Sequence, residues 1–253
     1  MKLLKKLILF TVIAAMAFAL VACGNGGETL EMATNAAFPP YEYKEGDSFA
    51  GIDIEIAQAI ADKLGMELKI NDVDFGTIVG GVETGKFDMG IAGLTVTPER
   101  LKSVNFSTSY ATGVQVVIVK EGSPITSVDD IITLGSKIGV QQDTTGDIYA
   151  SSSIKDGGFG ADKVTQYKTG ADAVQALLTD KIDCVIIDNE PAKSFVKANE
   201  GLKILETEYV VEDYAIAISK DNEDLLKKVN DVLAEMEADG SLKKIIDKYI
   251  PAE

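Results

Sequence analysis

The sequence of 253 residues contains no histidine. Histidine is the commonest general base and the commonest transition-metal ligand in proteins, and both Ser-His-Asp and Cys-His catalysis require it. Its absence therefore argues against most hydrolases and most metalloenzymes, although carboxylate or lysine chemistry stays open. We expect neither a metal ion nor an organic cofactor in this chain.

Basic residues are also scarce, since 24 Lys and Arg stand against 40 Asp and Glu and the formal net charge is −16. A negative field of this size repels phosphate backbones and anionic lipid headgroups, and no stripe of basic residues interrupts it. We therefore exclude a nucleic-acid partner. The simplest interpretation of the acidic excess is a solubilising surface, because the length and the 46% hydrophobic content are typical of a folded chain of one or two domains.

Only two cysteines are present, and the first ends an amino-terminal segment with the features of an export signal. Residues 1–6 carry three lysines, and residues 7–22 form an uncharged run that is shorter than the ~20 residues a membrane-spanning helix needs. The run ends in Leu20-Val21-Ala22-Cys23, which resembles a bacterial lipobox. That resemblance implies a signal peptide at 1–22, and a lipidated Cys23 with its glycine-rich tether at 23–27, on an exported protein anchored to the outer side of the cell membrane. The alternative is a core cysteine behind an uncleaved anchor.

The second cysteine, Cys184, lies inside the apolar run 182–187. No general base stands near it in the sequence, so we predict a buried structural thiol rather than a nucleophile. With lipid on Cys23, no disulfide can form within the mature chain.

Short apolar runs alternate with amphipathic helical patterns after residue 28, which predicts βα units around largely parallel sheets. The expected strands are 30–33, 68–70, 87–91, 113–120, 137–140, 163–167, 184–187 and 214–218. The expected helices are 53–64, 75–83, one after Thr144, 172–179, 190–197, 223–238 and 242–249. For the helix at 53–64 we expect Asp53 as the N-cap and Gly65 just beyond the carboxyl end.

Several segments, in order along the chain, resemble the polar amino-acid family of periplasmic-type binding proteins. They are 33–43, 51–53, 74–75, 85–88, 92–100, 105–107 with Tyr110, 139–141, 144–146 and 185–188. The segment Gly93-Leu94-Thr95-Val96-Thr97-Pro98-Glu99-Arg100 is the most specific of them. Together they extend over essentially the whole chain after the tether.

The resemblance implies an α/β fold of two lobes, the type II periplasmic-binding-protein arrangement, in which each lobe is a doubly wound sheet flanked by helices. Lobe 1 is expected at 28–110 and 217–253, and lobe 2 at 115–211. Two extended hinges would join them near 110–114 and 212–216, so that the lobes close over a ligand.

A free amino acid makes three demands on a site. Its carboxylate needs a fixed cation and N–H donors, its ammonium needs a buried carboxylate, and its carbon skeleton needs an apolar wall. Arg100, the sole arginine, is the candidate carboxylate clamp because a guanidinium matches a carboxylate bidentately. Thr95, Thr144 and Thr145 can add hydroxyl donors, and the turn at 144–146 can add backbone N–H groups. By local pattern alone, Arg100 is equally an exposed side chain near a helix start.

Asp188 follows apolar residues at the carboxyl end of an expected strand, where open α/β sheets place ligand groups. It matches the family's ammonium-binding aspartate, and the Gly93 carbonyl would bind the same ammonium. Asp188 is alternatively the N-cap of the following helix. Phe38 and Phe75 match the aromatic pair that holds the ligand between two rings, although aromatic residues more often belong to the core.

Two positions depart from the family pattern. Asn35 stands where binders of glutamine and of basic amino acids often carry aspartate, and Asp143 stands where a small residue is usual and would return a negative charge to the ligand. We expect a polar L-amino acid as ligand, either basic such as arginine or lysine, or glutamine, with a slight preference for basic. An acidic ligand is disfavoured because the sole arginine is already assigned.

The resulting hypothesis is an extracytoplasmic binding lipoprotein that captures the amino acid and delivers it to the permease subunits of an ABC importer, without catalysing a reaction. One rival is an amino-acid-sensing domain that acts with a membrane partner. The other is a secreted dehydratase on the same fold, which would need a catalytic acid or base in the cleft.

Overall fold

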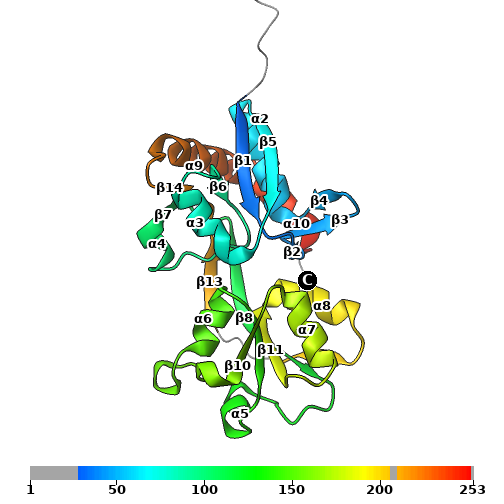
Figure 1. Ribbon diagram of the computed structural model, residues 1–253. Helices are drawn as coiled ribbons and strands as arrows, with labels where there is room; N and C mark the ends of the chain where they lie inside the picture. Colours follow the sequence, from blue (N-terminus) through cyan, green and yellow to red (C-terminus); the bar gives the residue numbers. More distant parts are fainter. Residues whose placement is uncertain (1–27, 206–209, 252–253) are drawn as a thin grey trace, which may run out of the picture.

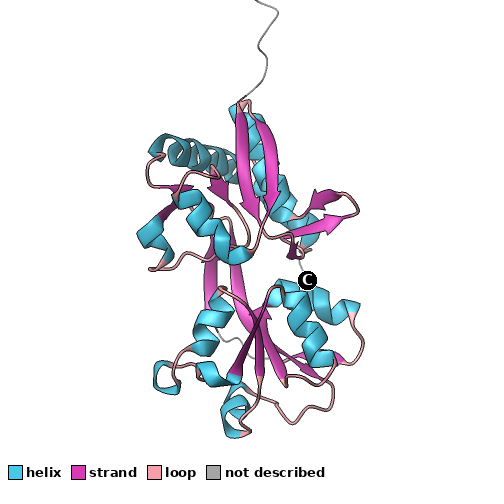
Figure 2. Cartoon of the chain, viewed as in Figure 1, coloured by secondary structure: helices cyan, strands magenta, loops and turns pink. Residues whose placement is uncertain are grey.

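The computed structural model describes residues 28–205 and 210–251. The predicted signal peptide, Cys23 and the tether lie outside the described residues. Figure 1 shows two α/β bodies connected by strands β8 and β13, and Figure 2 shows that each body has a sheet with helices packed against it. We call them the five-stranded lobe and the six-stranded lobe, after their sheets. In the described part of the chain, no helix has the length and apolar character needed to cross a membrane.

The five-stranded lobe has the strand order β5-β1-β6-β14-β7. Its strands are β1 (Thr29–Thr34), β5 (Glu67–Asp72), β6 (Met89–Gly90), β7 (Val104–Phe106) and β14 (Ala217–Ser219). Its helices are α2 (Ile52–Leu64), α3 (Ile78–Glu83) after the 3-10 turn η1 (Phe75–Thr77), α4 (Arg100–Ser103), α9 (Glu223–Ala238) and α10 (Ser241–Tyr249). A separate small sheet is formed by β2 (Ala37–Phe38), β3 (Glu42–Glu45) and β4 (Ser48–Ala50).

The six-stranded lobe has the strand order β10-β9-β11-β8-β12, and β13 also pairs with β8. Its strands are β8 (Ala111–Lys120), β9 (Ile138–Gln141), β10 (Val164–Tyr167), β11 (Cys184–Asp188), β12 (Leu202–Ile204) and β13 (Val210–Tyr214). Its helices are α5 (Val128–Thr133), α6 (Thr145–Ser151), α7 (Gly170–Leu178) and α8 (Asn189–Ala198), with 3-10 turns η2 (Ile154–Asp156) and η3 (Ala161–Lys163).

Strands β8 and β13 carry the chain between the lobes. They pair antiparallel, with Ala111 opposite Tyr214 and Gln115 opposite Val210. Tyr214 also forms a bridge to Thr95 of the five-stranded lobe. This two-stranded connection includes parts of 110–114 and 212–216, the segments where the sequence predicts hinges, and hinge motion there stays a prediction.

Apolar side chains at helical and strand spacing build the cores. Ile52, Ile56 and Ile60 follow one face of α2 and are fully buried against the sheet, and burial of each such side chain contributes about 1.5–3 kcal/mol. In the six-stranded lobe, β11 is buried along its whole length. Cys184 lies in it with no exposed surface, and burial raises the pKa of its thiol to about 12. The predicted buried thiol is confirmed.

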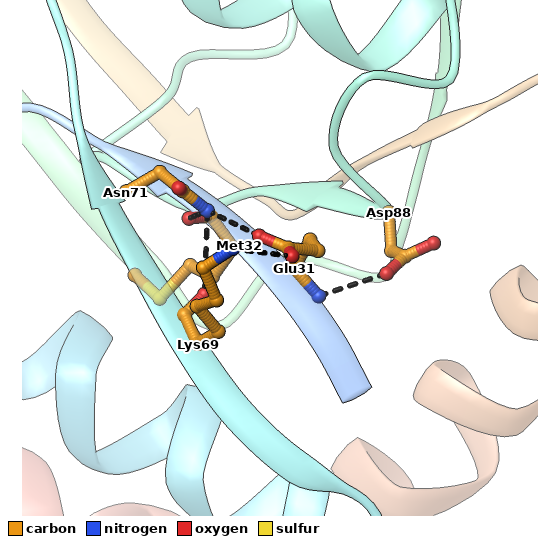
Figure 3. Close-up of polar contacts among 5 residues, drawn as sticks. All are labelled: Glu31, Met32, Lys69, Asn71 and Asp88. Atoms are coloured by element: carbon orange, nitrogen blue, oxygen red, sulfur yellow. Dashed lines mark hydrogen bonds and ion pairs between the residues drawn. The ribbon is translucent and has the colours of Figure 1, made fainter. Parts of the chain in front are cut away.

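Polar side chains along β1 tie three strands together, as Figure 3 shows. The Glu31 carboxylate accepts hydrogen bonds from Lys69 Nζ at 2.8 Å and from Asn71 Nδ2 at 2.7 Å, both on β5. The Glu31 backbone N–H donates to Asp88 Oδ2 at 2.8 Å, just before β6. These contacts support the observed register, in which Glu31 stands opposite Lys69.

The prediction that Asp53 caps α2 is wrong. The N-cap is Gly51, whose φ of 125° and close approach to the Tyr41 carbonyl leave no room for a side chain. The helix thus begins at Ile52, and Asp53 lies in its first turn with the carboxylate directed into the protein. Asp53 Oδ2 accepts a 2.7 Å hydrogen bond from the Gly93 backbone N–H. Gly65 ends the helix with φ of 68°, as predicted.

Three other expectations about strands need correction. The sheets are mixed rather than largely parallel, because β8 is antiparallel to β11, β12 and β13, and β14 is antiparallel to β6 and β7. The apolar run 214–218 is not one strand. Tyr214 ends β13 in one sheet and Ala217 begins β14 in the other, so the chain changes lobes within a run whose hydrophobic pattern is continuous. The strand predicted at 87–91 is reduced to Met89–Gly90.

Candidate functional site

A small cavity lies between the two lobes. Residues of the five-stranded lobe and its small sheet line one side, and residues of the six-stranded lobe line the other. The lining residues are Asn35, Phe38, Glu42, Phe75, Ala92, Gly93, Thr95, Arg100, Gln141, Thr144, Thr145 and Asp188. Nine of the ten predicted ligand-binding residues are therefore brought to one cavity, and Asp143 is not.

Arg100 begins the short helix α4 and turns its guanidinium into the protein, with 9% of the residue exposed. Its Nη1 donates to the Thr95 carbonyl at 2.8 Å, and its Nη2 donates to the Asp143 carbonyl at 3.2 Å. Burial lowers the pKa of Arg100 to about 10, so the group stays cationic at neutral pH. The guanidinium carbon lies 5.3 Å from the centroid of the Phe75 ring. The interpretation of Arg100 as an exposed helix-start residue is wrong.

Asp188 ends β11 and occupies the N-cap position of α8, but its side chain makes no capping hydrogen bond. Instead its Oδ1 accepts a hydrogen bond from the Tyr214 hydroxyl. Burial raises the pKa of Asp188 to about 7, and the nearby Glu212 charge adds to the rise, while the Tyr214 hydrogen bond opposes it. The carboxyl group is thus buried and close to half-ionised at neutral pH. A cation beside it would favour the charged form.

Aromatic rings form the apolar walls. Phe38 is buried at the end of β2 and stacks on Tyr41 at a centroid distance of 6.1 Å. Gly93 lies under the Phe38 ring with φ of 51°, and a Cβ at that position would stand 3.0 Å from a ring carbon. The positive φ therefore favours glycine at this position, and a Cβ would also press against the Phe38 ring. Phe75, half-buried in η1, contributes the second ring.

The threonine hydroxyls do not point where the sequence predicts. Thr95 Oγ1 and Thr145 Oγ1 donate to Glu212 Oε2 at 3.3 Å and 2.8 Å. Each hydroxyl has one proton to donate, so in this arrangement neither proton is directed at the cavity. Thr144 caps α6 by accepting from the Asp147 backbone N–H at 3.3 Å.

Glu42 is a lining residue that the sequence analysis missed. It lies on β3 with no exposed surface, and its carboxyl group shares a hydrogen bond with the carboxyl group of Asp53, while no N–H or alcohol O–H group among the described residues donates to it. Burial raises the pKa of Glu42 well above its usual value, and the Asp53 charge adds to the effect. An acidic residue directly after the buried Tyr41, within the segment 33–43, was the available signal.

Asn35 and Gln141 meet across the cavity. Gln141 Nε2 donates to Asn35 Oδ1 at 2.9 Å, and Asn35 Nδ2 donates to the Val73 carbonyl at 2.8 Å. Gln141, like Ala92, was not among the predicted site residues. Its position at the last residue of β9, where strand ends meet the cavity, was the signal that could have identified it.

Asp143 is exposed and lies outside the cavity, although its carbonyl accepts from Arg100. It has φ of 64°, and its carboxylate packs so closely on Gly76 that a Cβ on Gly76 would stand 2.1 Å from Asp143 Oδ2. It lines a neighbouring surface cavity together with Asp74 and Lys168. The carboxylate is therefore turned toward the facing lobe rather than toward the candidate site.

As for metals, no group of three or more acidic or cysteine side chains within the described residues is arranged to hold an ion.

Known proteins are similar to this chain over nearly its whole length. A family model described as bacterial extracellular solute-binding proteins, family 3, matches residues 30–252. The arginine-binding extracellular protein ArtP of Bacillus subtilis (strain 168) is 35% identical, over 99% of this chain and 100% of that protein.

Two solved structures are similar to this chain in three dimensions. An ancestral arginine-binding protein bound to arginine has a TM-score of 0.80 and 38% identity, over 87% of this chain and 97% of its own. An ancestral arginine-binding protein bound to glutamine has a TM-score of 0.81 and 38% identity, over 88% and 98%. The predicted two-lobe α/β class is confirmed by this agreement.

Proposed function

The chain belongs to the bacterial extracellular solute-binding proteins, family 3, and from that membership we propose that it binds one free polar L-amino acid, with arginine as the first candidate. It delivers the bound amino acid to the permease subunits of an ABC importer. It binds the ligand without changing it chemically.

One observation carries the proposal: the same cavity contains a buried guanidinium and a buried carboxyl group, and neither forms an ion pair with another of the described residues. Arg100 donates only to two backbone carbonyls among the described residues, and Asp188 is bonded to a neutral tyrosine hydroxyl. Unpaired charges are costly in a buried site. A free amino acid carries a carboxylate for Arg100 and an ammonium for Asp188, so its binding removes both costs.

The charge balance of the cavity supports a basic side chain. Two carboxyl groups, Asp188 and Glu42, line the cavity beside one guanidinium, that of Arg100. With Arg100 and Asp188 assigned to the ligand's α-carboxylate and ammonium, Glu42 remains for a second cation. A guanidinium offers several donors and a positive charge, which would favour the ionised form of this buried carboxyl group. The name of the related ArtP points to the same ligand.

Glutamine is the second candidate, and a different observation favours it. The bonded amides of Asn35 and Gln141 can exchange hydrogen bonds with a ligand amide. One of the structural relatives is an arginine-binding protein bound to glutamine. The sensing domain and the dehydratase stay as rivals; the first needs a signalling partner, and the second needs turnover of the bound ligand.

We also propose that the protein is exported and carries lipid on Cys23, which anchors it to the outer side of the cell membrane. The lipobox-like sequence at 20–23 supports this part of the proposal. Two or three acyl chains give stable anchoring, whereas one alone gives reversible binding. A mature protein whose amino terminus begins at Met1 would refute it.

The ligand itself is identified by mass spectrometry of small molecules released on denaturing natively purified protein. The proposal predicts one basic amino acid, or glutamine, in stoichiometric amount. A modified product in place of the added amino acid would support an enzyme instead.

A further inference from the structure

One buried carboxylate oxygen collects three hydrogen bonds from both lobes. Glu212 Oε2, on the connecting strand β13, accepts from Thr145 Oγ1 at 2.8 Å, from Gln115 Nε2 at 2.9 Å and from Thr95 Oγ1 at 3.3 Å. Thr95 belongs to the five-stranded lobe, Thr145 to the six-stranded lobe, and Gln115 to the second connecting strand, β8. Glu212 itself does not line the cavity.

Gln115 and Glu212 lie on the paired strands β8 and β13, and Thr95 is bridged to Tyr214 beside Glu212, so the contact that depends on the approach of the lobes is the one from Thr145. Thr95 Oγ1 and Thr145 Oγ1 lie 3.5 Å apart in the closed arrangement, and separation of the lobes would move Thr145 away from Thr95. Thr95 also offers its carbonyl to Arg100, so the position of this residue bears on the guanidinium as well. The Glu212 carboxylate is thus bonded directly to the lining residues Thr95 and Thr145, and it is connected to Arg100 through Thr95.

A carboxylate is well suited to this position. Each of its oxygens accepts several hydrogen bonds, and bonds to a charged acceptor are roughly twice as strong as neutral ones. Glu212 is 5% exposed, and its Oε1 has no partner among the described residues. A buried carboxylate is unfavourable unless donors surround it, so its interactions are better satisfied in the closed form than in an open one.

We propose that Glu212 is a positioning residue that couples lobe closure to ligand binding by holding Thr95, Thr145 and Gln115 together at the connecting strands. This inference rests on the proposed function, since it concerns closure around the same cavity. It assigns Glu212 no contact with the ligand. Its effect is on the population of the closed form and on how long the ligand stays bound.

The first test measures ligand kinetics on the purified mature chain. Glu212→Gln keeps the shape but loses the charge, and we expect amino-acid dissociation to accelerate about ten- to a hundredfold, the equivalent of one charge-assisted hydrogen bond, with association changed far less. Asp213→Asn, at the exposed neighbouring residue of β13, is the matched control and should stay within about twofold of the parent. Equal dissociation rates for Glu212→Gln and the parent would overturn the inference.

The second test does not depend on knowing the ligand. Spin labels on Glu83→Cys and Asp129→Cys, exposed positions of the two lobes, report the interlobe distance. Glu212→Gln should populate longer distances than the parent, either without ligand or with added arginine, even where its melting temperature is unchanged. Identical distributions in both conditions would overturn the inference. Failure of the parent chain to bind any amino acid would instead refute the proposed function, and the label distances would still decide the role of Glu212.

Discussion

Gln141 Nε2 donates a 2.9 Å hydrogen bond to Asn35 Oδ1, and this bond joins the two lobes across the candidate site. Asn35 is held from behind by its own bond to the Val73 carbonyl. Both side chains are neutral, so the charge that would select a basic ligand must come from elsewhere in the cavity. Of the two carboxyl groups that line the cavity, Glu42 is the one not assigned to the ligand's α-ammonium, and a guanidinium beside it would favour its charged form.

Glu42→Gln should weaken arginine binding about ten- to a hundredfold, because the guanidinium loses its only unassigned carboxylate partner. Glutamine affinity should change much less, since an amide is a suitable partner for another amide. Calorimetric titration with both amino acids gives the ratio. Glu45→Gln, an exposed position on the same strand, is the control and should leave the ratio unchanged. Equal losses for the two ligands would mean that Glu42 does not select the side chain.

Arg100→Ala should weaken binding of every amino acid by about 3–5 kcal/mol, because a ligand carboxylate would be buried without its cation. Arg100→Lys should recover only part of the loss, since an ammonium cannot bind a carboxylate bidentately. Lys102→Ala removes an exposed cation from the same helix and serves as the control. Wild-type affinity in Arg100→Ala would show that the carboxylate site lies elsewhere.

Affinity should depend on pH through Asp188. Its pKa is about 7 in the free protein, and pairing with a ligand ammonium lowers it, so binding below that pH requires loss of a proton. Affinity should therefore level off just above pH 7, where the ligand's α-amino group is still protonated, and fall as the pH drops below about 7, approaching tenfold per pH unit. Titrations in two buffers of different ionisation enthalpy would measure the released protons. Asp188→Asn should bind weakly and lose most of this dependence; an unchanged pH profile would contradict the role given to Asp188.

The same raised pKa has an effect of opposite sign on the unliganded fold. The ordinary pKa of the group is 3.8 and the folded value is about 7, so the folded chain binds the proton more tightly than the unfolded chain. The contribution of Asp188 to stability is complete below about pH 4 and is lost as the pH rises through 7. As the pH rises from 5 to 8, the unfolding free energy of Asp188→Asn should accordingly increase relative to that of the parent. A difference that is constant over this interval would argue against the raised pKa.

Asp143→Asn should leave arginine and glutamine affinities within about twofold of the parent, because the carboxylate packs on Gly76 outside the cavity and is screened by solvent. Asparagine is the appropriate replacement, since the φ of 64° is tolerated by Asn better than by Ala. A selective loss of arginine affinity, measured in the same titrations, would restore the sequence-based prediction that Asp143 faces the ligand.

Most of the helices and strands follow from local patterns in the sequence, whereas the two-lobe arrangement and much of the site follow from the resemblance to a known family. The apolar face of α2 is followed by Gly65, a residue type typical of a helix C-terminus. The buried strand at Cys184–Asp188 is predictable from its continuous apolar run. Asp188 is predictable from its position at the end of a strand, and Arg100 from its place in the family-like segment 93–100. The gathering of nine predicted residues around one cavity shows how informative such matches are when they occur in order along the whole chain.

What local patterns could not provide was the packing between distant segments. Asp53 is a residue type that is common at the N-cap, but the N-cap is Gly51, two positions earlier, where the backbone approaches Tyr41 too closely for a side chain. Glu42 and Glu212 look like surface acids in the sequence, and their burial depends on strands that pair only in the folded chain. The orientation of Asp143 is likewise fixed by contact with Gly76, sixty-seven positions away in the sequence.

Isothermal titration calorimetry of the purified mature chain, freed of bound ligand by unfolding and refolding, against each of the twenty L-amino acids shows directly whether the chain binds a polar amino acid. We expect one-to-one binding, tightest for arginine or another basic amino acid, with glutamine next. We also expect an accompanying gain in unfolding free energy of about 2.7 kcal/mol at a ligand concentration of about 100 times the dissociation constant. No binding by any of the twenty, or tight binding of glutamate with none of arginine or glutamine, would contradict the proposed function.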